Sequence, residues 1–320
     1  MKQRMNVGGQ AVIEGVMMRA NRTVVSVRAP DGSIKTEVLE EEPFIKRSRL
    51  SKIPFLRGIV VMIDAILTGF KALDVSARLS STEEENFTTK DFVISLLLAI
   101  LIGIGMFVLG PLLVARLTVG RDSSLFSLIE GLTRGGIFLT YLWIISLFRD
   151  VKRLFAYHGA EHKAVYTYEM GEELTVDNAS KYSTLHPRCG TTFLVVVIFI
   201  SIVVFSFADM IFGSSTLSRI LSRILLIPLI ASLSYEAQKL TARNPKNLIS
   251  RIFLAPGLMT QLITTAQPSE DQLEVALTAL RAALADNEKK ENQRDRQIED
   301  ERPSTLKERN EVTESRVSGE

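Results

Sequence analysis

The residues best suited to metal chemistry are confined to one short part of this sequence. All three histidines lie between positions 158 and 186, and the single cysteine follows at position 189. Imidazole nitrogen and thiolate sulfur are common ligands of zinc and neighbouring first-row metals. This clustering predicts one divalent metal site, with zinc as the preferred ion, formed by His158, His162, His186 and Cys189.

His158 and His162 are four residues apart, which places both rings on one face of a helix, one turn from each other. The string His-Gly-Ala-Glu-His has the His-x-x-Glu-His form of inverted zincins, in which the carboxylate acts as general base. Glu161 is therefore a candidate catalytic residue. The alternative is that these histidines lie at a membrane interface and do no chemistry.

His186 and Cys189 belong to the segment His-Pro-Arg-Cys, in which Pro187 favours a turn over a helix. A turn that faces the two-histidine helix would complete a tetrahedral site. Cys189 has two alternative roles. One is a nucleophile whose thiolate is favoured by Arg188, and the other is a small buried residue at the start of an apolar helix.

A further acidic candidate lies near the N-terminus, in a segment where three glycines surround Glu14. Glycines permit tight backbone turns there. Glu14 is a candidate catalytic base or ligand if this segment and the histidines share one face of the membrane. The alternative is a hairpin residue that pairs with Arg19.

Residues 1–52 are predicted to form a small β-rich cytoplasmic unit. The alternating run 23–28 and the run 34–39 flank Pro-Asp-Gly-Ser, a sequence typical of a hairpin turn. Residues 53–80 are apolar with embedded charges, and the uninterrupted apolar part is shorter than the ~20 residues of a membrane span. This segment is predicted as an amphipathic helix at the membrane interface, or alternatively as a buried helix of the soluble unit.

Residues 91–240 are predicted to form a domain of four transmembrane helices, which makes the chain a mainly α membrane protein. Each span is close to the length needed to cross a bilayer. Glu130 and Arg134, spaced i, i+4, are expected to pair near one membrane face. Between the second and third spans, residues 149–190 form a loop that carries the metal-site residues. The predicted spans are 92–115, 125–148, 191–212 and 217–235.

The distribution of Lys and Arg predicts orientation. Basic residues are abundant before the first span, in the loop 149–190 and after the fourth span, and sparse in the other connections. The positive-inside rule then places both termini and the histidine loop in the cytoplasm of a multi-pass protein. The single cysteine fits a reducing compartment, and a net charge of only +2 gives no support for binding nucleic acid.

Residues 241–285 are predicted as a cytoplasmic helical segment. Ser269 and Gln272 resemble a capping box, and four leucines up to Leu284 form one stripe. Residues 286–320 are almost entirely polar and charged and are predicted to be a disordered tail. The expected partners are the lipid bilayer and proteins bound through residues 268–285 and the tail.

Five motifs together resemble the YqhQ family of bacterial multi-pass membrane proteins, over roughly residues 5 to 285. The family is of unknown function and is described generically as predicted metal-dependent enzymes. The resemblance implies a location in the bacterial cytoplasmic membrane and metal-site roles for His158, Glu161, His162, His186 and Cys189. The motifs are Gly-Gly-Gln-Ala-Val-Ile-Glu-Gly-Val-Met-Met-Arg at 8–19, Pro-Phe-Leu-Arg-Gly at 54–58, Tyr-His-Gly-Ala-Glu-His-Lys at 157–163, His-Pro-Arg-Cys-Gly-Thr at 186–191 and Gln-Leu-Ile-Thr-Thr at 261–265.

The sequence thus favours an integral membrane metalloprotein with a cytoplasmic-face site. If it is an enzyme, the simplest reaction is metal-dependent hydrolysis of an amide or ester at the membrane surface. The alternative is a non-enzymatic membrane scaffold or assembly factor in which the histidine and cysteine cluster is structural.

Overall fold

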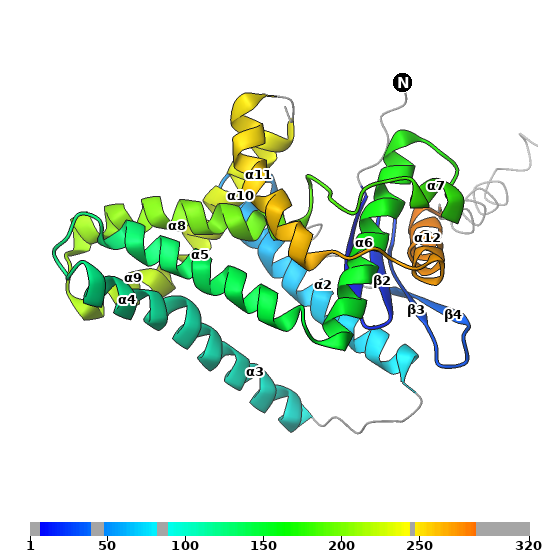
Figure 1. The fold of residues 1–320 in the computed structure, drawn as a ribbon, viewed down its shortest axis with the longest axis horizontal. Helices are drawn as coiled ribbons and strands as arrows, with labels where there is room; N and C mark the ends of the chain where they lie inside the picture. The colour runs from blue at the N-terminus through cyan, green and yellow to red at the C-terminus, as the bar shows by residue number, and fades with distance from the viewer. Residues whose placement is uncertain (1–6, 40–47, 82–88, 244–246, 286–320) are drawn as a thin grey trace, which may run out of the picture. The chain divides into compact units, whose positions relative to one another are not determined.

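The computed structural model describes residues 7–39, 48–81, 89–243 and 247–285. The predicted disordered tail, 286–320, lies outside these described residues. The elements below belong to one compact unit, Met1–Ala283, beyond which the last helix extends by one residue. The fold is mainly helical with one N-terminal sheet, as the sequence predicts (Figure 1).

The sheet is an antiparallel meander of four strands in sequence order. The predicted hairpin between the third and fourth strands is present, and Gly32 closes its turn with a φ of 82° that favours glycine. Glu14 occupies the turn between the first two strands and also has a positive φ, of 50°. The strands are β1 (Gly8–Val12), β2 (Gly15–Arg19), β3 (Thr23–Arg28) and β4 (Ile34–Leu39).

Helix α2 (Arg57–Ser80), which follows the 3-10 turn η1 (Arg49–Lys52), covers one face of this sheet with its C-terminal half. Strand side chains alternate between faces, and every second one on this side joins a common apolar core. The N-terminal half of α2 instead contacts α10 (Ile227–Arg243). The core residues are Val12, Met17, Val25, Val27, Ala72 and Val75.

The opposite face of the sheet is covered by α6 (Arg149–Met170) and α12 (Glu270–Leu284) (Figure 1). The predicted capping box of α12 is present, since Ser269 N–H donates to Gln272 Oε1 at 3.0 Å and Gln272 N–H donates to Ser269 Oγ at 3.4 Å. Leu273, Leu277 and Leu280 of the predicted stripe are buried and Leu284 is half-buried, and Arg28 of β3 pairs with Glu274 at 2.7 Å. The chain's own sheet therefore occupies the apolar face of this helix.

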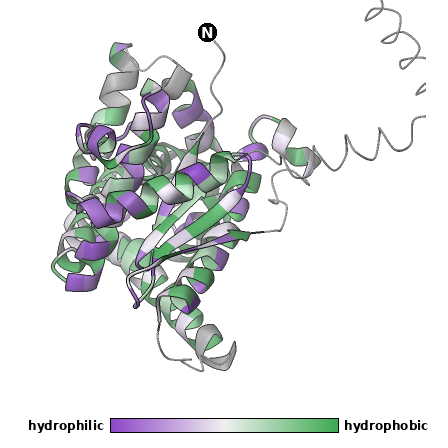
Figure 2. Ribbon diagram, turned by 90° about the vertical axis from the view of Figure 1, so that its right-hand side faces the viewer, coloured by the Kyte–Doolittle hydropathy of each residue, from purple (hydrophilic) through white to green (hydrophobic). Residues whose placement is uncertain are grey.

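Three segments are long and apolar enough to cross a membrane: Val93–Thr118, Phe126–Ile145 and Gly190–Phe212. A fourth is the bent pair Thr216–Leu225 and Ile227–Thr241, whose halves meet at 50°. Pro228 follows the bend and has no N–H for the carbonyl four residues earlier, which explains the break. These segments coincide closely with the predicted spans, and hydrophobic residues run through both the strands and the helices (Figure 2).

The first of these apolar segments consists of three helical pieces, and the second and third segments lie side by side (Figure 1). Pro111 cannot donate a hydrogen bond to the Phe107 carbonyl, so that carbonyl accepts from Arg134 Nε at 2.9 Å instead. The three pieces are α3 (Thr89–Ile104), the π-helix η2 (Gly105–Leu109) and α4 (Gly110–Thr118). The other helices not yet named are α5 (Phe126–Ile145), α7 (Val176–Ser180), α8 (Gly190–Phe212), α9 (Thr216–Leu225) and α11 (Leu248–Thr264).

A buried ionic network joins α5, α8 and α9. The predicted pair of Glu130 and Arg134 is present at 2.5 Å. Arg223 links it to the next helix, because its guanidinium contacts Glu130 and Asp209, each at 2.6 Å. Arg219 also contacts Asp209, at 3.1 Å. Charges this deep in an apolar bundle are tolerated only when paired.

Candidate metal centre

Helix α6 places the predicted site residues on two of its sides. It begins after Phe148 and ends at Gly171, whose left-handed φ of 79° is the usual helix C-terminal conformation of glycine. His158 and His162 lie one turn apart, with ring centroids separated by 4.4 Å. The predicted helical i, i+4 pair is therefore present, and most of the surrounding helix is buried.

Two backbone carbonyls orient this pair. His158 Nδ1 donates to the Thr264 carbonyl at 2.8 Å, and His162 Nδ1 donates to the Thr184 carbonyl. A carbonyl only accepts hydrogen bonds, so both Nδ1 atoms carry the proton when the rings are neutral. Each Nε2 is then left with its lone pair, which is the arrangement that metal-binding histidines normally have.

Cys189 faces the histidine pair from the N-cap position of α8. The distance from its Sγ to His158 Nε2 is 3.1 Å. The His-Pro-Arg-Cys segment is a turn, as predicted, closed by Cys189 N–H donating to the His186 carbonyl at 3.3 Å. One ligand atom from each of His158, His162 and Cys189 lies within 4.8 Å of the others, so a single ion can reach all three.

His186 is close to this group without belonging to it. Its ring centroid lies 5.6 Å from that of His162, and its Nε2 is 3.6 Å from the nearest oxygen of Glu169. Gln261 holds its backbone, accepting the His186 N–H at 2.7 Å and donating to its carbonyl at 2.9 Å. Burial lowers the pKa of both His162 and His186, which favours neutral rings able to bind a cation.

Glu161 is buried between α6 and β1. Its Oε2 lies 3.5 Å from His162 Nε2, beside the predicted ligands. The carboxylate also accepts the backbone N–H of Gly9, and a Cβ at Gly9 would lie 2.7 Å from Glu161 Cγ. Burial raises the pKa of Glu161, although the nearby His158 and His186 oppose that rise. A buried carboxyl with a raised pKa is a suitable general base or acid.

Glu14 lies against the same side of α6 as Glu161, nearer the start of the helix. It pairs with Arg153, whose Nε is 2.6 Å from Glu14 Oε1, and Tyr157 donates its hydroxyl to the same carboxylate at 3.4 Å. Burial, followed by the charge of Glu14, raises the pKa of Tyr157 to about 12. The expected alternative partner of Glu14 was wrong, because Arg19 instead binds Asp64 of α2 at 2.6 Å.

Several residues that shape the site were not predicted from the sequence. The segment after α11 crosses α6 closely at Gly159, where a Cβ would lie 2.2 Å from the Ala266 carbonyl. The same crossing delivers the Thr264 carbonyl to His158. Gln261 and Thr264 belong to the Gln-Leu-Ile-Thr-Thr motif, which was the available signal for their importance.

Comparison with known proteins explains why these motifs occur together. Residues 53–286 match the family described as "Protein of unknown function (DUF1385)". The chain belongs to this family. It is also 33% identical over 298 residues to the "Uncharacterized protein YqhQ" of Bacillus subtilis (strain 168), covering 87% of this chain and 92% of that protein. No solved structure matches the chain.

The family match includes the histidine and cysteine cluster and Glu161, but it begins after the sheet. Gly9 and Glu14, which contact α6 from β1 and its turn, therefore lie outside the matched region. The similarity to the Bacillus protein extends over most of the chain. Membership is thus established by sequence, while the chemistry of the site has to be argued from its geometry.

Proposed function

We propose that this protein is an integral membrane metalloprotein in which His158, His162 and Cys189 bind one divalent ion. The observation that carries the proposal is the convergence of three ligand atoms within 4.8 Å, two of them on rings oriented by backbone carbonyls. Oriented imidazoles and a nearby sulfur form an unusual combination unless an ion is bound between them.

The donor set favours zinc. Two imidazole nitrogens and one sulfur are too soft for magnesium or calcium, which prefer oxygen. Three protein ligands with a fourth position open to water are typical of catalytic zinc, whereas structural zinc has four protein ligands. His186, buried beside His162, is the nearest further ligand if the site is structural.

The reaction that best fits these residues is hydrolysis of an amide or ester at the membrane surface. Bound zinc would supply Lewis acidity and increase the acidity of a water molecule. Glu161, whose Oε2 is 3.5 Å from His162 Nε2, would accept the proton of that water and return it to the leaving group. Its raised pKa supports this role.

Embedding in a membrane is supported by the surface of the apolar helices. Three helices, or four if the bent pair is one span, are apolar enough to cross a bilayer, and large side chains on them such as Leu101 and Met210 are exposed. Exposed apolar surface of this extent requires a non-aqueous neighbour. We propose that both termini and α6 lie in the cytoplasm, because the flanking segments carry most of the basic residues.

Metal analysis of protein purified in its membrane tests the proposal directly. We expect about one zinc per chain in the wild type, and a large loss in His158→Ala, His162→Ala and Cys189→Ser variants, since two ligands hold zinc far more weakly than three. Lys181→Gln, on the same connection but exposed, is the matched control and should keep its metal. Negligible zinc, iron and manganese in both wild type and variants would contradict the proposal.

His186→Asn distinguishes a catalytic from a structural ion in the same experiment. Unchanged metal content would favour the open three-ligand site and hence hydrolysis. Metal loss equal to that of His158→Ala would indicate a closed site in which His186 is the fourth ligand, and would argue against catalysis. In the scaffold alternative, partner proteins would bind mainly through the tail. The apolar stripe of α12 is largely buried within the chain and is therefore not free to bind them.

A further inference from the structure

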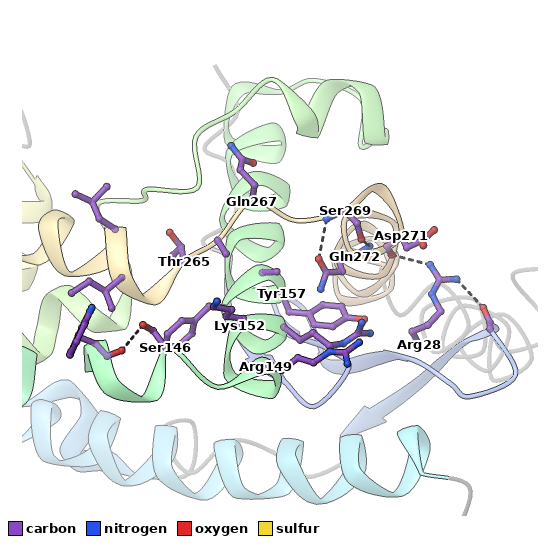
Figure 3. A pocket seen from close by; sticks show the side chains of 18 residues that line it. Arg28, Ser146, Arg149, Lys152, Tyr157, Thr265, Gln267, Ser269, Asp271 and Gln272 are labelled. Carbon is purple, nitrogen blue, oxygen red and sulfur yellow. Dashed lines mark hydrogen bonds between the residues drawn. The ribbon is translucent and has the colours of Figure 1, made fainter. Parts of the chain in front are cut away.

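A cavity of about 1040 Å³ lies beside α6, separate from the metal-site side chains. It is bounded by the end of α5, the first two turns of α6, the end of α11 and the segment that leads into α12 (Figure 3). The segment 264–266 divides the two regions. Its Thr264 carbonyl binds His158, while Thr265 and Ala266 line the cavity.

The lining of the cavity is strongly basic. Arg28, Arg149, Lys152 and Arg153 contribute to it, and Asp271 is the one acidic residue in its described lining. Arg28 and Arg153 are neutralised by Glu274 and Glu14 respectively. Arg149 and Lys152 make no side-chain hydrogen bond or ion pair among the described residues. The cavity therefore has two positive charges available to an anion.

The first turn of α6 adds free backbone N–H groups to this lining, and its one acidic side chain, Asp150, is not part of the lining. Arg149 is its first residue, and Phe148 at the N-cap provides no side-chain hydrogen bond to the free backbone N–H groups. Such N–H groups and the helix dipole favour a phosphate or another anion. Arginine and lysine both bind phosphate oxygens, arginine with two parallel hydrogen bonds. A phosphate is thus the anion that these groups fit best.

The other side of the cavity is apolar and lies where α5, an apolar span, ends. Trp143 is 57% exposed and Leu262 is 67% exposed, and both contribute to the lining. Tryptophan is enriched at the level of lipid headgroups, where one part of its ring is in hydrocarbon and the other is hydrated. A ligand that fills this cavity therefore has a phosphate at one end and hydrocarbon at the other.

We propose that the cavity binds the headgroup of an anionic phospholipid. Its phosphate lies against Arg149 and Lys152, and the first part of its acyl chains lies beside Trp143 and Leu262. A soluble phosphate would use the cations but would leave the exposed apolar side uncovered. A zwitterionic lipid would cover that side but would carry a positive choline group into a basic cavity. This site does not depend on metal binding.

Trp143 is the only tryptophan of the chain, so its fluorescence reports on this cavity. Purified full-length protein in detergent micelles is titrated with phosphatidylglycerol or phosphatidylcholine carrying brominated acyl chains, which quench nearby tryptophan. We expect phosphatidylglycerol to quench at a mole fraction about 30-fold lower than phosphatidylcholine, since each of the two basic residues contributes roughly a fivefold preference for an anionic lipid.

Arg149→Gln/Lys152→Gln should lose this preference, so that both lipids quench at the same mole fraction. Lys181→Gln/Lys239→Gln removes the same charge from exposed positions away from the cavity and should behave as wild type. Equal quenching of the wild type by both lipids would overturn the proposal. It would also be overturned if the control lost as much preference, or if water-soluble glycerol phosphate displaced the quenching lipid at equal concentration.

Discussion

Glu161 is in contact with backbone on one side and close to a histidine ring on the other. The absence of a side chain at Gly9 lets β1 approach α6 closely enough for its N–H to bind the carboxylate. This approach also fixes where the carboxylate points, 3.5 Å from His162. The geometry of the proposed general base therefore depends on a glycine in the sheet, far from the histidines in sequence.

Gly9→Ala tests this dependence. The new Cβ would lie 2.7 Å from Glu161 Cγ and 2.8 Å from the Met17 carbonyl oxygen. Either the Glu161 side chain or strand β1 therefore has to move. We expect a loss of about 1–3 kcal/mol in unfolding free energy, as for overpacked sites, measured by thermal unfolding in detergent.

Gly8→Ala is the matched control, because a Cβ at Gly8 has no atom within 4 Å. It should be neutral, or slightly stabilising through its effect on the unfolded chain. Equal stability of the two variants would show that β1 does not constrain Glu161.

At the scale of elements, α6 connects every part of the site. One side of it carries the histidine pair, a second side faces the sheet through Arg153, Tyr157 and Glu161, and its first two turns line the lipid cavity. The ionisable residues in the first turns of this helix are exposed, whereas Glu161, His162 and Lys163 further along it are buried. Their burial makes the stability of the element depend on pH.

Acidification should change the folding stability in two opposing ways, through ionisable groups on α6 and on the loop that follows it. His162 and His186 have pKa values lowered by burial from 6.5, so below about pH 6.5 the unfolded chain binds protons that the native state excludes, and stability falls. Glu161 acts in the other direction. Its raised pKa means that the native state binds its proton first as pH decreases towards 4.5, which stabilises that state.

Glu161→Gln removes the second effect and also the charge that raises the pKa of His186, so both changes act in the same direction. We expect metal-free protein with this substitution to lose stability more steeply than wild type between pH 6.5 and 5, by up to about 1.4 kcal/mol per pH unit. Thermal unfolding midpoints in chelator provide the measurement. Glu173→Gln, an exposed carboxyl on the same connection, should follow the wild type. Parallel profiles for Glu161→Gln and wild type would show that Glu161 does not take up this proton.

At the scale of the whole molecule, the ionic network at the other end of α5 holds the apolar helices together. Among the residues that the structure describes, Arg134, Arg219 and Arg223 share the two carboxylates of Glu130 and Asp209, so the cations outnumber the carboxylates. The ring of Phe205 lies 5.1 Å from the Arg134 guanidinium and 4.6 Å from that of Arg223, which partly compensates the excess.

This imbalance predicts which substitutions in the network cost the most stability. Glu130→Gln leaves buried Arg134 without its carboxylate partner and Arg223 with Asp209 alone, and should cost about 3–5 kcal/mol, as for other broken buried pairs. Arg223→Gln should cost less, because Glu130 keeps Arg134 and Asp209 keeps Arg219. Detergent stability and expression level of the two variants provide the comparison, with exposed Arg116→Gln as control. The reverse order would mean that Arg223 acts as a link between helices more than as a charge.

Features that depend on near neighbours in the chain were predictable from the sequence. The apolar runs predict the long apolar helices, the i, i+4 spacing predicts the pairs His158–His162 and Glu130–Arg134, and Ser269 with Gln272 predicts a helix start. Each rests on a helical period or a capping pattern that local sequence carries in full. The membership of the family follows from sequence in the same way.

Only the tertiary structure decided which distant groups meet. Cys189 reaches His158 across 31 positions, and the Thr264 carbonyl reaches the same ring across 106. The tertiary structure also places His186 outside the group of three converging ligands. It pairs Glu14 with Arg153 and not with Arg19. Such contacts depend on how α6, α8 and α11 pack, and packing is set by the summed burial of many side chains rather than by any local pattern.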